Sequence, residues 1–98
     1  MTAYLVVDIR VHDAHRYQEY VSRAPAFVEK HSGQYIVRGG DVEVAEGSWR
    51  PERLVVVRFP SKEHAHAFLD DPEYQAVATI RQAATDSKLL VVDGYEDG

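Results

Sequence analysis

The sequence predicts one α+β domain whose elements follow the order βαββαβ. Four segments carry the two-residue alternation or the aliphatic runs of strands, and two longer segments between them carry helical periodicity. The chain has 98 residues, which suffices for one hydrophobic core and argues against a second domain.

The first strand and the first helix are predicted by the spacing of apolar residues, which changes from every second residue to helical spacing. Residues 3–11 alternate apolar and other side chains, as a strand does. Asp13 suits an N-cap, and residues 17–28 place apolar side chains at helical spacing. Pro25 interrupts this pattern, which indicates two helical pieces or one kinked helix. Gly33 fits a C′ stop.

A glycine pair marks the middle of the chain. Residues 34–38 have the composition of a second strand, and the apolar alternation resumes over residues 42–44. Gly39 and Gly40 fall inside this extended pattern, so a β-bulge or a close backbone approach is expected there. Residues 46–52 follow as a loop.

The second half repeats the strand, helix and strand order. Residues 53–59 form an aliphatic third strand. Ser61 is expected to cap a helix, and a further helix restarts with Asp71 as N-cap and Pro72 at its first position. Residues 88–93 form the fourth strand. The order is therefore that of the ferredoxin-like split βαβ fold, with a four-stranded antiparallel sheet.

Two strands carry unbroken apolar runs, which predicts a partner. Residues 54–57 and 89–92 are apolar throughout, as expected where both faces of a sheet are covered. Two helices can cover only one face, so we expect a homodimer through sheet-to-sheet packing; the alternative is a monomer with a bare apolar face. The domain is expected to span residues 1–95, with a flexible tail at 96–98.

Composition excludes several classes of function. The net charge of −5 argues against nucleic acid and against an anionic membrane surface as partners. The chain has no cysteine, which excludes thiolate nucleophiles and Cys-ligated zinc. No apolar run is long enough to span a bilayer, and the N-terminus has no signal-peptide pattern, so a cytoplasmic location is expected.

A combined pattern lies in residues 35–40, 46–57, 59–61 and 71–75, with Arg81. Together these segments resemble domain-of-unknown-function family thirteen-thirty, of the dimeric α/β-barrel superfamily. The resemblance covers nearly the whole chain and implies a ferredoxin-like protomer in a dimeric barrel. Superfamily members include cofactor-free monooxygenases, small-molecule isomerases, haem-degrading enzymes and effector-binding modules, and fold alone does not choose among them.

Arginines are the leading candidates for a ligand site. Arg38 precedes the glycine pair, where a bulge would turn its guanidinium into a cleft. Together with Arg81 it would clamp a small anion, because the guanidinium fork matches carboxylate and phosphate. The alternative is structural: salt bridges of Arg38 or Arg53 with Glu46 or Glu52.

Aromatic and acidic side chains complete the candidate site. Trp49 is interpreted either as a lid or as an anchor that packs the loop, the second being favoured. Tyr20 and Glu46 are the candidates for moving a proton. The candidate ligand-binding residues are Arg38, Gly39, Gly40, Trp49, Arg53, Tyr74 and Arg81.

No motif in the sequence identifies a reaction, a cofactor or a metal site. Asp8, Arg10 and Arg58 are charges inside strand patterns, and they are expected either to form an interstrand pair, with Asp8 beside Arg58 as the first candidate, or to line a cavity. The expected function is to bind or convert a small anionic or polar metabolite between sheet and helices. The alternatives are a non-catalytic ligand-binding module and a structural interaction dimer.

Overall fold

The computed structural model describes residues 1–96 and confirms the predicted βαββαβ order, with the second helical segment divided in two. Glu96, predicted to lie in a tail, accepts a hydrogen bond from the backbone N–H of Thr2 at 2.8 Å; the rest of that predicted tail, residues 97–98, lies outside the described residues. The elements are β1 (Ala3–Val11), α1 (Ala14–Lys30), β2 (Gln34–Arg38), β3 (Arg53–Phe59), α2 (Lys62–Asp70), α3 (Pro72–Ala84) and β4 (Thr85–Asp93).

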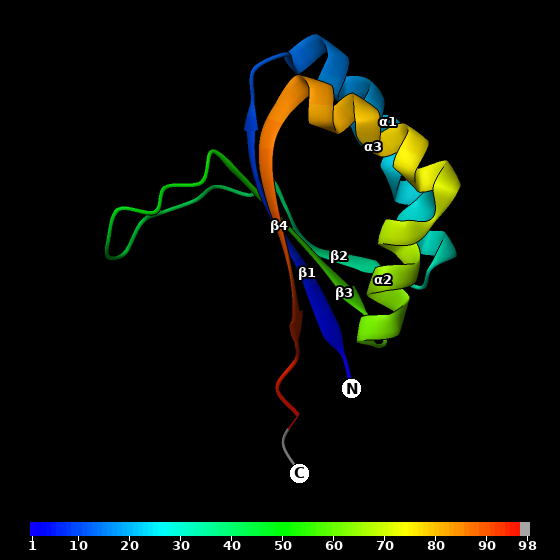
Figure 1. Cartoon of the computed structure of the whole chain (residues 1–98). Helices are drawn as coiled ribbons and strands as arrows, with labels where there is room; N and C mark the ends of the chain where they lie inside the picture. The colour runs from blue at the N-terminus through cyan, green and yellow to red at the C-terminus, as the bar shows by residue number, and fades with distance from the viewer. Residues whose placement is uncertain (97–98) are drawn as a thin grey trace.

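The four strands form one antiparallel sheet in the order β2-β3-β1-β4. All three helices lie on the same face of this sheet, as Figure 1 shows. The arrangement is the ferredoxin-like fold in two layers, one of helices and one of strands. The molecule is accordingly flat, with principal extents of 44 × 38 × 16 Å.

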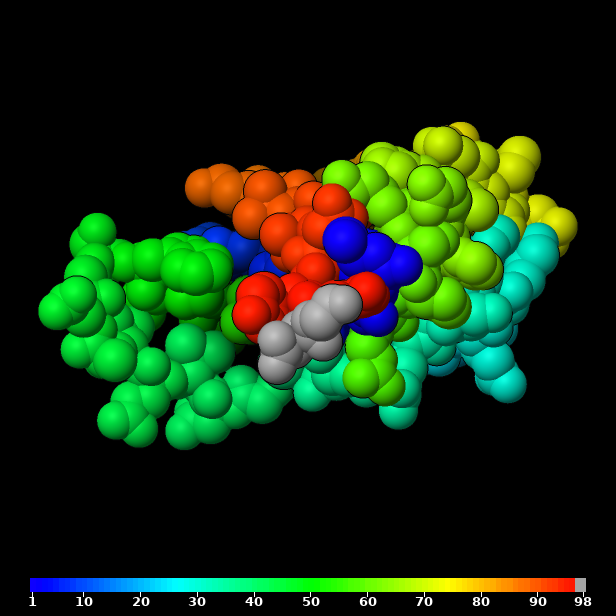
Figure 2. Space-filling view, turned by 90° about the horizontal axis from the view of Figure 1, so that it is seen from below, coloured from blue at the N-terminus to red at the C-terminus, as the bar shows by residue number. Residues whose placement is uncertain are grey.

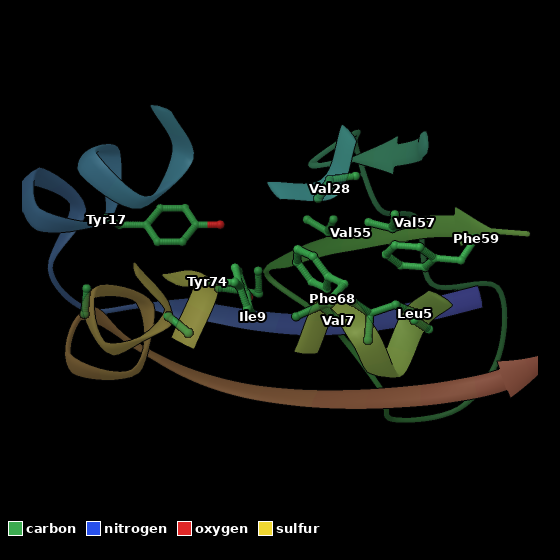
Figure 3. Close-up of a cluster of buried hydrophobic side chains, with 13 residues drawn as sticks. Leu5, Val7, Ile9, Tyr17, Val28, Val55, Val57, Phe59, Phe68 and Tyr74 are labelled. Atoms are coloured by element: carbon green, nitrogen blue, oxygen red, sulfur yellow. The ribbon is translucent and has the colours of Figure 1, made fainter. Parts of the chain in front are cut away.

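The core lies between the sheet and the helices (Figure 3). Alternate residues of β1 are buried against the helices, as strand geometry requires. At the α2 end, Phe59 and Phe68 are fully buried, and the rings of Phe68 and Tyr74 lie 4.1 Å apart. This aromatic packing fixes α2 on the sheet.

The helix α1 is a single helix that continues through Pro25. Asp13 caps its N-terminus as predicted. At its C-terminus the left-handed residue is Ser32 (φ 64°) and not Gly33, so the predicted C′ position was one residue late. The N–H of Gly33 donates to the carbonyl of Val28 at 2.8 Å, which completes a Schellman motif. Gly33 is needed for space, because a Cβ there would lie 2.8 Å from the Val28 side chain.

Asp71 joins the end of α1 to the start of α3. Its Oδ1 accepts the backbone N–H of Glu73 at 2.9 Å, which confirms the predicted N-cap. Its Oδ2 accepts Lys30 Nζ and His31 Nε2, both at 2.8 Å. Hydrogen bonds from Lys30, and after it from His31, hold the pKa of this carboxyl well below its ordinary range. One carboxylate thus fixes the relative position of two helices.

The segment after β2 differs from the expected strand. The strand β2 ends at Arg38, and residues 39–52, here called the arm, contain no strand. Gly39 has φ +70°, which turns the chain out of the sheet, so the alternating residues 42–44 have no strand to pair with. The sheet does contain a bulge, but it lies at Ile36, between Tyr35 and Val37, and not at the glycine pair; at Gly39 the structure shows the alternative, a close approach of the Arg53 side chain.

The fourth strand begins earlier than predicted. It starts at Thr85 and not at Lys88, because the polar residues Thr85 and Ser87 pair with Val11 and Ile9 of β1. In the sequence, these polar residues resemble those of a turn. In the structure, pairing with β1 extends the strand through them.

The predicted Asp8–Arg58 pair is wrong. Asp8 lies opposite Leu54 in the register of β1 and β3, and Arg58 lies opposite Tyr4. Arg58 instead donates to the side chain of Gln34 at 2.8 Å. The two charges are on the same face but four positions apart, a separation that the sequence does not reveal.

The face of the sheet opposite the helices is bare in the single chain. We call it the open face, and define it by the outward residues of the four strands. Its apolar side chains include Leu90, Val92 and Ile36, which are 64%, 49% and 46% exposed. The remaining apolar members are Tyr4, Val6, Val37, Leu54 and Val56.

The arm stands apart from the helical layer. In Figure 1 it projects on the side of the open face, and in the view from below it lies at the opposite end of the molecule from the helices (Figure 2). Fourteen-residue connections without secondary structure are uncommon in compact domains and usually functional.

Candidate functional site

A cavity opens between α1, α3 and the helix-covered face of the sheet, and we call it the inner cavity. It encloses about 480 Å³ of space including its open mouth, but the centre of a water-sized molecule can reach only about 40 Å³ of it. Its lining includes aliphatic residues of three strands, four tyrosines and three arginines. The polar lining residues are Tyr17, Tyr20, Tyr35, Arg38, Arg53, Tyr74 and Arg81.

Arg38 reaches this cavity because of the bulge. Tyr35 points to the helices, and the extra residue Ile36 shifts the alternation so that Arg38 also does, opposite Val55. Its Nη2 donates to the carbonyl oxygen of Val21 in α1 at 3.0 Å. The guanidinium carbon lies 4.6 Å from the centre of the Tyr35 ring. Arg38 therefore connects the end of β2 to α1 at the rim of the cavity.

Arg53 occupies space that only glycine leaves free. A Cβ on Gly39 would lie 2.7 Å from Arg53 Cζ, and Gly39 also has a left-handed backbone. Arg53 Nε donates to the Tyr17 hydroxyl at 3.1 Å, with its Cζ 5.7 Å from that ring. Figure 3 shows this hydroxyl pointing from α1 into the cluster. Gly40 has no atom within 4 Å of such a Cβ.

Neither rim arginine forms the salt bridge considered from the sequence. Within residues 1–96, no ion pair joins Arg38 or Arg53 to Glu46 or Glu52. Both guanidinium groups are held instead by a carbonyl, a hydroxyl and aromatic faces, which stabilise cations without neutralising them.

Arg81 is the buried cation of the site. It is 6% exposed, and its Nη1 donates to Ser87 Oγ at 2.5 Å. Its Nε is buried and has no hydrogen-bond partner in the part of the chain that the structure describes. The inner cavity that Arg81 lines contains no aspartate or glutamate. A buried guanidinium without a carboxylate is costly, since buried charges are ordinarily paired.

Two tyrosines, Tyr20 of α1 and Tyr74 of α3, line the cavity together with Arg81. The hydroxyls of Tyr20 and Tyr74 lie 2.7 Å apart, and the Arg81 Cζ lies 5.8 Å from the Tyr20 ring centre. Burial, and after it the neighbouring Tyr74, raise the pKa of Tyr20 far above its ordinary value, although Arg81 acts in the opposite direction. Tyr20 therefore keeps its proton, and either hydroxyl can donate to the other. The rings of Tyr17 and Tyr20 stack at 5.9 Å.

Trp49 and Glu46 lie on the arm and not in the inner cavity. Trp49 is 61% exposed, and its Nε1 donates to Asp8 Oδ2 at 2.9 Å on the open face. It borders a second, wider groove that also touches Arg81. Glu46 is exposed and lines neither cavity. The structure therefore groups Tyr20, Tyr74 and the three arginines, and separates Trp49 and Glu46 from them.

Two contributions to the site were missed at the sequence level. Ser87 accepts the hydrogen bond of Arg81 Nη1 and belongs to a segment that was interpreted as a connection between elements. The polar residues of that segment have no pattern that would predict a strand or a binding site. Tyr35 was treated as part of a strand, and its place under Arg38 depends on the bulge.

Within residues 1–96, no group of three or more His, Cys, Asp or Glu residues is arranged to hold a metal ion. None of the helices in this part of the chain has the length and apolarity to cross a membrane.

Fold and cavity together define a ferredoxin-like α+β protein with a cationic, tyrosine-lined inner cavity. The chain belongs to the family "Domain of unknown function (DUF1330)", whose model matches residues 2–95. This confirms the resemblance that the sequence motifs indicated. No curated protein matches the sequence.

Three solved structures share the fold. The protein of unknown function RPA0582 from Rhodopseudomonas palustris is 18% identical, with a TM-score of 0.80 over 98% of this chain and 84% of that one. SnoaB, a cofactor-independent oxygenase from Streptomyces nogalater, is 15% identical, with a TM-score of 0.68 over 98% and 95%. A dimeric ferredoxin-like protein of unknown function from Jannaschia sp. is 12% identical, with a TM-score of 0.70 over 96% and 100%. At these identities the similarity establishes the fold alone.

Proposed function

We propose that this protein is a homodimer whose subunits each bind a small anionic metabolite in the inner cavity. The observation that carries the proposal is Arg81, a guanidinium 6% exposed whose Nε has no hydrogen-bond partner within residues 1–96 and whose inner cavity has no carboxylate in its lining. The second groove, which Arg81 also borders, is lined by Asp8, Glu52 and Asp86, but within the described residues none of them forms an ion pair with Arg81. Such a group is stabilised when an anion enters, because the ligand supplies the missing charge and hydrogen-bond acceptor.

The rest of the cavity suits a bound small molecule. Aliphatic walls with a few convergent polar groups are typical of ligand sites. Tyr20 and Tyr74 share one hydrogen bond, so one of their two protons is available to a ligand. Arg38 and Arg53 lie at the rim and give it a positive potential, although the whole chain carries −5.

Binding is favoured over catalysis as the proposed activity. The oxygenase SnoaB shows that this fold hosts chemistry in another protein, but the fold does not transfer that activity. Of the two proton-transfer candidates, Glu46 lies outside the cavity. Tyr20 has a raised pKa, which suits a hydrogen-bond donor better than a group that exchanges protons near neutral pH.

The open face supports the homodimer. Leu90, Val92 and Ile36 are about half exposed or more on a flat face that no helix covers. The chain exposes 6387 Å², against about 5,700 Å² for a compact monomer of this mass. The excess is close to the area of roughly 800 Å² that one subunit buries in a standard interface. A structural neighbour of similar size is a dimer.

Thermal denaturation with a panel of small anions tests the proposed function. The panel contains acetate, butyrate, succinate, citrate and inorganic phosphate, each assayed with wild type and with Arg81→Gln. At least one anion should stabilise wild type, by about 2.7 kcal/mol at 100 times its dissociation constant, and should leave Arg81→Gln unchanged. Stabilisation of both proteins alike, or of neither, contradicts the proposal.

A second variant separates function from structure. Arg81→Met fills the same space without a charge, so the unliganded variant should be at least as stable as wild type. Urea denaturation measures this. A loss of more than about 3 kcal/mol would mean that Arg81 is a structural ion whose removal breaks the fold.

A further inference from the structure

We propose that the ligand is a short monocarboxylate with an apolar body, held by the Nε–Nη2 edge of Arg81. This inference rests on the proposed function and specifies the ligand's class. It follows from which edge of the guanidinium is free, from the charges that the cavity leaves unneutralised and from the space available.

The free edge of Arg81 is defined by its one hydrogen bond. Nη1, the nitrogen on the Cδ side of the guanidinium, donates to Ser87 Oγ. Nε is buried without a partner, and Nη2 forms no hydrogen bond with residues 1–96. The Nε–H and one Nη2–H point in parallel, so together they form a two-pronged donor. Two oxygens of one planar group match this geometry, as in a bidentate arginine–carboxylate pair.

The hydrogen bonds that the three arginines already form favour a ligand with a single negative charge. Arg38 already donates to the Val21 carbonyl, and Arg53 to the Tyr17 hydroxyl. Among residues 1–96, only Arg81 has a buried side-chain donor without an acceptor. A second negative charge that lies between the aliphatic walls, away from the rim arginines Arg38 and Arg53, would be unpaired, which is costly. One oxyanion satisfies the site.

The walls and volume define the rest of the molecule. Beyond the arginines, the cavity is bounded by strand residues such as Val7, Val55 and Leu89 and by Phe68 of α2. The centre of a water molecule can reach only about 40 Å³ of this cavity, so its free space suits a small acid with a short hydrocarbon body and not a large metabolite. The free Tyr20 or Tyr74 proton is a further donor for its oxygens.

Four small molecules test whether the ligand is a monocarboxylate with an apolar body. They are butyrate, succinate, 1-butanol and inorganic phosphate, measured by isothermal titration calorimetry with the full-length protein at one pH and ionic strength. Butyrate should bind at least tenfold more tightly than each of the others. Succinate adds a second charge, butanol removes the charge, and phosphate removes the apolar body.

Substitutions of Arg81 and of its hydrogen-bond partner Ser87 test whether the Nε–Nη2 edge binds the ligand. Arg81→Lys keeps the charge but loses the fork, and should weaken butyrate at least tenfold, while Arg81→Gln should abolish binding. Ser87→Ala removes only the Nη1 partner and should change affinity less than threefold. Circular dichroism confirms that each variant is folded.

Each outcome has a distinct meaning. Tighter binding of succinate or phosphate than of butyrate overturns the monocarboxylate class and leaves the proposed anion site standing. Equal binding of butanol and butyrate, or equal affinity of Arg81→Lys and wild type, overturns the role of the free edge. If no anion in either panel binds, the proposed function fails as well.

Discussion

The hydroxyl groups of Tyr20 and Tyr74 lie 2.7 Å apart and connect α1 to α3 across the inner cavity, although 54 positions separate the residues in sequence. Burial and this contact raise the pKa of Tyr20 above its ordinary value. The folded state therefore favours the neutral phenol. Its contribution to stability is complete below about pH 10, the ordinary tyrosine pKa, and is lost as pH rises toward the folded value.

Tyr20→Phe should consequently change the alkaline limb of the stability profile. At pH 7 the variant loses one buried hydrogen bond, about 0.5–1.5 kcal/mol. Above about pH 10, wild type should lose stability more steeply than the variant, because only wild type must keep Tyr20 neutral. Urea denaturation at pH 7 and at pH 11 measures both effects. Tyr95→Phe, at a side chain 90% exposed, is the control; parallel profiles for wild type and Tyr20→Phe would refute the coupling.

Asp71→Asn should make the protein less stable at neutral pH and less sensitive to acid. Hydrogen bonds from Lys30 and His31 lower the pKa of Asp71, so its contribution is present above about pH 4 and disappears as pH falls further. The variant should melt several degrees lower at pH 7, and the difference from wild type should narrow below about pH 4. Melting curves from pH 7 to pH 3 measure this, with exposed Asp70→Asn as control. A constant difference across this range would show that the charge is not responsible.

Gly39→Ala and Gly40→Ala form a matched pair. An alanine Cβ at position 39 would overlap the Arg53 guanidinium and strain a left-handed backbone, whereas position 40 has open space. We expect Gly39→Ala to cost about 1–2 kcal/mol and Gly40→Ala less than about 0.5 kcal/mol. Urea denaturation decides; equal effects would mean that Gly39 does not make room for Arg53.

Leu90→Lys should separate the proposed dimer. Leu90 is 64% exposed at the open face, and a charge there would be desolvated in a sheet-to-sheet interface. Sedimentation velocity at micromolar concentration should give a dimer for wild type and a monomer for the variant. Ala83→Lys, on the exposed side of α3, should remain dimeric. A stable, well-folded wild-type monomer would remove the basis for the homodimer.

The type of each element was predictable because it depends on local patterns. The alternation from Ala3 to Val11 and the Asp71-Pro72 helix start are visible within a few residues. Arginine and tyrosine were identified as candidates from side-chain chemistry alone, and Arg38, Arg53 and Arg81 do meet in one cavity.

The details of the site depend on contacts between distant segments. The bulge at Ile36 decides which face Arg38 occupies, and it exists only in the pairing of β2 with β3. Ser87 reaches Arg81 because β4 extends back to Thr85 along β1. Glu46 was a candidate for moving a proton, but it lies on the arm and outside the cavity.

The side-chain Nε–H resonance of Arg81 tests most directly whether this buried guanidinium anchors an anion. In ¹H–¹⁵N spectra of the full chain, assigned with Arg81→Lys, butyrate should move the Arg81 Nε–H signal downfield in a saturable manner, because a carboxylate then accepts from it. Arg38 and Arg53 should move much less. An Arg81 signal that stays fixed while butyrate binds and stabilises the protein would contradict the proposed anchor.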